Sequence, residues 1–249
     1  METNKRSLRL PELSSSTLHI LAMVFMLLDH MWATVLPGVN WMTCLGRIAF
    51  PLYAFLLVEG YFHTHSFRAY LIRMAVFALV SEIPFNLMYG AHVFWPVNQS
   101  VYVTLIVALL SLHLLETVRA GGKLWLYVLT CVLTVPVASV LTILLFSDYH
   151  GYGVLMVFVF YFFRQRKWWS YLGQLVLMYY ICDQVGGLCY QFDIFGHSVE
   201  VVRQSFSLLA LPLVWLYRGK KGIRSKTFQY ICYGFYPAHI LVLALLMLR

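Results

Sequence analysis

An acid and an imidazole stand side by side in the middle of an apolar run, at Asp29-His30 in the segment LHILAMVFMLLDHMWATVL. If this run crosses a bilayer, two ionisable groups lie in hydrocarbon, where a charge at the centre of a helix costs several kcal/mol. Imidazole titrates near neutral pH, so His30 is suited to general acid–base catalysis. Asp29-His30 is therefore the first candidate for a reaction centre inside the membrane.

The helical rise places two further ionisable side chains at the level of His30. At about 1.5 Å per residue, His30 lies roughly 18 Å along its apolar run, Glu82 roughly 20 Å and His239 roughly 18 Å along theirs. Arg47 enters its own run from the other side, and its long side chain reaches toward the same level. Neighbours on a helix point about 100° apart, so we expect Asp29 to pair with Arg47, and Glu82 or a carbonyl to fix the tautomer of His30.

A dry site would strengthen hydrogen bonds to a charge that develops during a reaction, and His239, Tyr236 or Arg47 could donate them. Simpler interpretations stay open for the same residues. His239 alone could form an ordinary interhelical hydrogen bond, and Asp29 with Arg47 could be a purely structural ion pair.

A second polar group lies nearer the other end of these runs. Glu59 is followed by two histidines and by Arg68 and Arg73 in the segment LLVEGYFHTHSFRAYLIR. Guanidinium groups hold phosphates bidentately, so a mouth for an anionic ligand is one interpretation. This mouth would also draw on basic residues of a later loop, namely Arg164, Arg166 and Lys167. The alternative is that Glu59 anchors a helix end and that the arginines extend toward the membrane surface.

The elements that must position these residues are membrane helices. Of the 249 residues, 61% are hydrophobic and 11% are charged, and apolar runs close to the length of a membrane span recur throughout. We predict a single all-α domain over 1–249 with about nine spans. The spans lie near 18–36, 43–62, 69–88, 101–118, 124–146, 150–163, 168–187, 201–217 and 227–248.

The basic residues fall in alternate loops. They are Lys5, Arg6 and Arg9; Arg68 and Arg73; Arg119 and Lys123; Arg164, Arg166 and Lys167; and Arg218, Lys220, Lys221, Arg224 and Lys226. By the positive-inside rule the N-terminus is cytoplasmic and the C-terminus external. The net charge of +8 therefore orients the chain in the lipid bilayer and does not indicate a nucleic-acid partner.

The five cysteines show no metal-ligand spacing, so no metal is expected. Cys182 and Cys189 could form a disulfide or stay free.

Several segments resemble the TraX family in their order along the chain. They are MLLDHMWA, LGRIAFPLYAFLLVEGYFHTHSFRAYLIRMAVFALVSEIPFNLMYG, SDYHGYGVLMVFVFYF, LLALPLVWLYRGKKG and YGFYPAHILVL. The resemblance runs from about residue 18 to the C-terminus. Two departures concern the stretch NQSVYVTLIVALL, which is less aromatic than usual, and His150, which follows Asp148-Tyr149 where glycine is more usual.

The resemblance implies a function. TraX proteins are implicated in N-terminal acetylation of pilin and look related to transmembrane acyltransferases with an essential histidine, which here would be His30. The charged motif residues would be Asp29, Arg47, Glu59, Glu82, Asp148 and His239, with Tyr149 beside Asp148. The expected activity is acyl-CoA-dependent O- or N-acyl transfer, with acetyl-CoA or another acyl-CoA as donor, in the bacterial inner membrane.

The acceptor would be a small molecule or a peptide such as a pilin N-terminus, and homo-oligomers are compatible with the sequence. The main alternative is a proton-coupled small-molecule transporter, because buried acids and histidines also form proton relays. Transporters tend to have repeated halves, and the sequence has no such repeat. A structural subunit of a membrane assembly is the third class, but it would not need His30, Glu82 and His239 at one depth.

Overall fold

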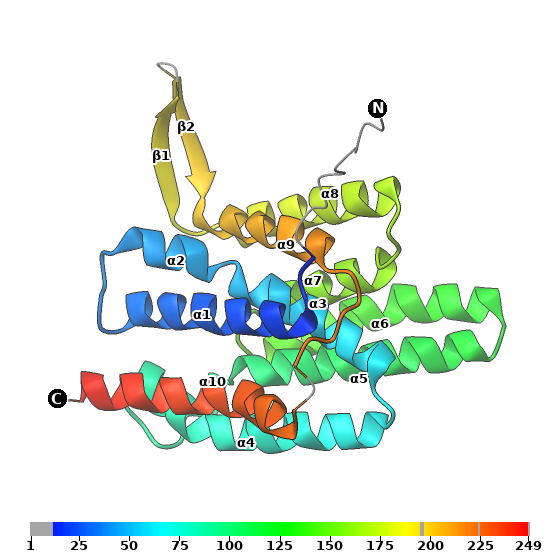
Figure 1. The fold of residues 1–249 in the computed structure, drawn as a ribbon, viewed down its shortest axis with the longest axis horizontal. Coiled ribbons are helices and arrows are strands. Elements are labelled where there is room, and N and C mark those ends of the chain that lie inside the picture. Colours follow the sequence, from blue (N-terminus) through cyan, green and yellow to red (C-terminus); the bar gives the residue numbers. More distant parts are fainter. Residues whose placement is uncertain (1–11, 195–196, 224, 249) are drawn as a thin grey trace, which may run out of the picture.

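The computed structural model describes residues 12–194, 197–223 and 225–248, where the chain forms a helical bundle with one β-hairpin (Figure 1). Lys5, Arg6, Arg9, Arg224 and the C-terminal Arg249 lie outside these ranges. The helices are α1 (Ser15–Ala33), α2 (Asn40–Gly46), α3 (Ala49–His63), α4 (Phe67–Gly90), α5 (Val101–Ala120), α6 (Leu124–Leu144), α7 (His150–Phe162), α8 (Trp168–Val185), the 3₁₀ helix η1 (Arg203–Leu209), α9 (Ala210–Leu216) and α10 (Lys226–Met247). The strands are β1 (Cys189–Ile194) and β2 (His197–Val202).

Six helical segments of the described chain are long and apolar enough to cross a membrane, which indicates a multi-pass membrane protein. They are α1, α2 with α3, α4, α5, α6 and α10. Helix α7 has 13 residues, which is short for a span. The count of nine spans and the orientation of the termini remain predictions.

The expected second span is two helices. Helix α2 ends at Gly46 and α3 begins at Ala49, so Arg47 lies at the break between them. Pro51 is the third residue of α3, where its missing N–H would have no partner inside the helix. Most of α3 is buried, and it contacts α1, α5, α7 and α9 at the centre of the bundle.

The fold is mainly α-helical as expected, with one β-hairpin added, and the expected span at 201–217 is a shorter helical segment in the structure. Residues up to Val202 belong to an antiparallel hairpin, in which Cys189 pairs with Val202 and Ile194 with His197. The chain then forms η1, and the seven-residue α9 follows with Pro212 in its first turn. Pro212 has no N–H to donate to the carbonyl four residues earlier, in η1, which disfavours one continuous α-helix through η1 and α9.

The basic loops gather at one end of the bundle. Residues at the end of α3, in the α5–α6 loop, in the α7–α8 loop and after α9 all line the same cavity, as His63, Lys123, Arg164 and Arg218 show. The hairpin and the end of α10 lie at the opposite end (Figure 1). The loops that the charge pattern assigned to one side therefore lie together in the fold.

Candidate functional site

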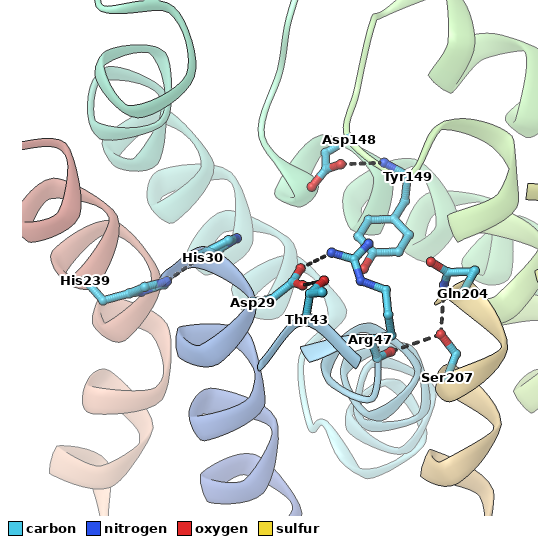
Figure 2. A network of polar contacts seen from close by, with 9 residues as sticks. All are labelled: Asp29, His30, Thr43, Arg47, Asp148, Tyr149, Gln204, Ser207 and His239. Carbon is cyan, nitrogen blue, oxygen red and sulfur yellow. Dashed lines mark hydrogen bonds and ion pairs between the residues drawn. The ribbon is translucent and has the colours of Figure 1, made fainter. Parts of the chain in front are cut away.

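Asp29 and His30 leave α1 in different directions and meet different helices, as expected (Figure 2). Asp29 accepts a hydrogen bond of 2.7 Å from the Thr43 hydroxyl of α2 and forms an ion pair with Arg47 at the α2–α3 break. His30 instead contacts His239 of α10. The predicted Asp29–Arg47 pair is thus confirmed.

A glycine permits this approach of α1 to α2. A Cβ atom built on Gly46 would lie 2.4 Å from the Asp29 Cβ and 2.8 Å from its Cα. These distances are far below normal contact, so any side chain at Gly46 would move Asp29 away. The ion pair is largely buried, because the Arg47 and Asp29 side chains are only 16% and 14% exposed.

His30 belongs to a chain of hydrogen bonds that fixes its tautomer. The Nδ1 of His239 is 2.7 Å from the Phe235 carbonyl, and the Nδ1 of His30 is 2.7 Å from the Nε2 of His239. A carbonyl oxygen only accepts, so His239 carries its proton on Nδ1 and, when neutral, accepts at Nε2. His30 then donates from Nδ1, which leaves its Nε2 as a bare lone pair. In Figure 2 the far end of the His30 ring points away from His239.

Glu82 is not the partner of His30, contrary to expectation. Its carboxylate accepts hydrogen bonds from the backbone N–H of Ser100, at 3.2 Å, and from the Ser100 hydroxyl, at 2.8 Å. Glu82 therefore holds the start of α5 against α4. Depth along a helix predicted the level of Glu82 but not the direction in which it points.

Pro237 leaves a carbonyl of α10 free to bond with α5, close to the two histidines. A proline has no N–H, so the Tyr233 carbonyl one turn earlier loses its helical donor. The Tyr102 hydroxyl of α5 donates to this carbonyl at 3.2 Å. The hydroxyl of Tyr236 has no hydrogen-bond partner in the described part of the chain.

The loop before α7 brings a second acid to the site. Asp148 accepts from the Tyr149 N–H at 2.9 Å, and the charges of both Asp148 and Asp29 act on Arg47. Burial raises the pKa of the Asp148 carboxyl, although Arg47 and the Tyr149 N–H act against this. Tyr149 and His150 both have positive φ, at 62° and 42°, which is uncommon outside glycine and fits the departure noted at His150.

These residues surround a small pocket of about 130 Å³. Its lining includes Asp29, His30, Arg47, Asp148, Tyr149 and Tyr236, all predicted, together with Tyr53, Tyr89 and Tyr102. The Tyr149 ring stacks on Phe50 with centroids 3.9 Å apart. The pocket therefore combines one imidazole, one guanidinium, two carboxyl groups and several hydroxyls within mostly apolar walls.

A larger cavity of about 890 Å³ lies at the end of the basic loops. Glu59 lines it and pairs with Arg164 at 2.9 Å, and Arg166 lines it as well. Of the five basic residues from which the mouth was expected to draw, Arg164 and Arg166 line this cavity, and Arg68, Arg73 and Lys167 do not. The structure places Arg119, Lys123 and Arg218 there instead, beside Tyr127, Tyr161 and Trp215.

Comparison with known proteins bears on this arrangement. A family model described as "TraX protein" matches residues 14–247. The chain belongs to the TraX family. A relative from Dichelobacter nodosus, named "Probable fimbrial assembly protein FimC, serogroup H1", is 29% identical over 249 residues, which cover 93% of this chain and 95% of that protein. No solved structure matches the chain.

The sequence of this TraX protein gave no direct sign of several site residues. Thr43 and the Phe235 carbonyl have roles only because the helices meet as they do. Arg119, Lys123 and Arg218 carried a signal, since all three were in the basic loops that the charge pattern grouped. Cys182 is buried and Cys189 is exposed, and both are free thiols.

Proposed function

We propose that this TraX protein is an acyltransferase that moves an acetyl or other acyl group from acyl-CoA to an amine or hydroxyl, with His30 as the general base. The observation that carries the proposal is the hydrogen-bond chain from the Phe235 carbonyl through His239 to His30. It presents the Nε2 lone pair of His30 in a mostly apolar pocket, where the neutral imidazole can accept a proton.

The proton transfers balance through this one histidine. His30 Nε2 takes the proton as the acceptor nitrogen or oxygen bonds to the thioester carbonyl carbon. The C–S bond then breaks, and the departing thiolate takes the proton back from His30. His239 holds the His30 ring by the same hydrogen bond in both steps.

The oxyanion formed during attack needs donors. The Tyr236 hydroxyl lines the pocket and has no partner among the residues the structure describes, and Arg47 supplies a positive charge on the same pocket. Asp29 holds Arg47 in place through the ion pair, so we assign Asp29 a positioning role.

The larger cavity is the proposed entrance for acyl-CoA. Lys123 and Arg218 have no ion-pair partner among the described residues, so they are available for phosphates, while Tyr127 and Trp215 offer ring faces. Helix α3 joins the two cavities, because Glu59 lines the larger and Phe50 the smaller. The two linings come close together on this helix, at Tyr53 of the smaller cavity and Phe55 of the larger one.

The acceptor is proposed from the relative. A protein named for fimbrial assembly suggests an N-terminal amine of a pilin-like subunit as one acceptor. The amine would reach the small pocket from the end opposite the basic loops.

The first test measures thiol release from acetyl-CoA by the purified full chain in detergent, with and without amine acceptors. We expect His30→Gln to lower kcat by about 10²-fold or more, because glutamine keeps a polar side chain but cannot take the proton. His19→Gln is the matched control, since His19 lies on the same helix and bonds only to the Ser15 carbonyl. A fully active His30→Gln protein would end this mechanism.

The same assay separates the proposal from a proton-coupled transporter, which a buried pair of histidines would also suit. A transporter would not release thiol from acetyl-CoA.

A further inference from the structure

Three of the buried hydrogen-bond donors that lack an acceptor in the described part of the chain lie close together. They are Trp32 Nε1, Arg47 Nε and Arg203 Nη1. Buried polar atoms in folded proteins nearly always have partners, so an unpaired donor needs an explanation. All three here are donors, and two belong to cations. This is the pattern expected of a site that awaits an anion.

The three side chains form one cluster. The Arg203 guanidinium lies over the Trp32 ring, with its central carbon 4.8 Å from the ring centroid. The charges of Arg47 and Asp29 both act on Arg203. Trp32 is one helical turn or less from Asp29 and His30 on α1, so the cluster adjoins the small pocket.

The cluster is built on firm supports. The backbone N–H of Arg203 donates to the Leu188 carbonyl at 2.8 Å, where the hairpin meets η1. The Ser207 hydroxyl of η1 donates to the Arg47 carbonyl at 3.0 Å, and Gln204 donates to Ser207 at 2.7 Å (Figure 2). These bonds fasten η1 to the α2–α3 break and hold the two arginines near each other.

Arg203 lacks an ion-pair partner among the described residues. Arg47 pairs with Asp29 and lies under the charge of Asp148 as well, whereas no acid of the described chain forms an ion pair with Arg203. An unpaired guanidinium in a partly buried place favours a further negative charge.

We infer that Trp32, Arg47 and Arg203 bind an anionic group, a carboxylate or a phosphoryl group, and that the acyl acceptor carries this group near its reacting amine or hydroxyl. The second half rests on the proposed function, and it places the acceptor at the end of the molecule that bears the hairpin. The acceptor is then held by its acidic group while its nucleophile reaches His30.

The test uses the fluorescence of Trp32. The full chain in detergent is titrated with inorganic phosphate or acetate at constant ionic strength, and the change is taken as the difference between wild type and Trp32→Phe. We expect a saturable change whose Kd rises about tenfold or more in Arg203→Gln, because a charged hydrogen bond is lost. Arg68→Gln removes the same charge outside both cavities and should leave the Kd unchanged.

A titration without a saturable change, or an unchanged Kd in Arg203→Gln, would overturn the site. A change produced only by vesicles of anionic phospholipid, and not by phosphate or acetate, would overturn the acceptor assignment in favour of a lipid headgroup. Thiol release from acetyl-CoA is measured on the same wild-type preparation. Its absence would refute the proposed function, while the titration would still decide the anion site.

Discussion

The basic nitrogen of His30 depends on a residue more than 200 positions away. The Phe235 carbonyl fixes the tautomer of His239, and His239 in turn fixes the tautomer of His30 through a hydrogen bond of 2.7 Å. Glutamine at position 239 offers both an amide donor for that carbonyl and an oxygen for His30. We expect His239→Gln to lower kcat by about tenfold and His239→Ala by about 10²-fold, because alanine leaves the His30 tautomer unset.

The pH profile of kcat/KM distinguishes this role from a structural one. His239→Gln should keep a single ionisation of the base, and His239→Ala should shift it. Equal losses in both variants with an unchanged profile would show that His239 only packs against His30.

For individual residues, the sequence predicted the ion pair of Asp29 with Arg47 but not the contact between the two histidines, His30 and His239. Asp29 and Arg47 had to find partners inside an apolar bundle, and each was a suitable partner for the other. His30 had two acceptable partners at the same depth. The position of a residue along α4 does not specify how the helix is rotated about its axis. That rotation points Glu82 toward Ser100 instead.

At the level of elements, α1 and α2 approach each other only because residue 46 is glycine. Alanine there would meet both the side chain and the backbone of Asp29. We expect Gly46→Ala to destabilise the protein by about 1–3 kcal/mol, as overpacking does, and to reduce activity by displacing Asp29 and Arg47. Thermal unfolding in detergent measures the first effect.

Gly234→Ala is the matched control. Gly234 lies inside α10, and a Cβ built there has no neighbour within 4 Å. Alanine is the better helix former, so this variant should be as stable as wild type or more stable by up to about 1 kcal/mol. If both glycine variants melted alike, the close approach at Gly46 would not limit packing.

Continuous apolar runs predicted most helices, but two elements needed more than hydrophobicity. The break at Arg47 is hard to predict from an apolar run, because the run continues across it, although Gly46 directly precedes it and Pro51 follows four residues later. The hairpin had a signal in the alternating segment CYQFDI and in the glycine that follows shortly after it in the sequence. The predicted membrane span at 201–217 overlapped the end of the second strand, so the hairpin was not predicted.

Over the whole molecule, the larger cavity collects its cations from loops far apart in sequence. We expect Lys123→Gln and Arg218→Gln to raise the KM for acetyl-CoA severalfold, to about tenfold, with little change in kcat, because they bind far from the thioester. Steady-state kinetics measures both constants. Arg68→Gln, outside the cavity, is the control, and an unchanged KM in both cavity variants would mean that the donor enters elsewhere.

The gathering of basic loops at one end predicts the orientation in the membrane. Cys189 is exposed on the hairpin, so a membrane-impermeant maleimide should label it from outside intact spheroplasts. Cys189→Ser should remove this labelling, and adding Lys167→Cys to that variant should restore it only after permeabilisation. Labelling of Lys167→Cys in intact spheroplasts would reverse the orientation.

Pro237 has a consequence for how the bundle is assembled. Its missing N–H leaves the Tyr233 carbonyl without a helical donor, and the Tyr102 hydroxyl takes that carbonyl. In hydrocarbon an unpaired carbonyl is costly, so α10 alone is an incomplete membrane helix. During synthesis α5 emerges long before α10, and the hydroxyl is already in the membrane when the carbonyl arrives. Because α5 precedes α10 in the sequence, the Tyr102 hydroxyl is available to the Tyr233 carbonyl as soon as α10 inserts.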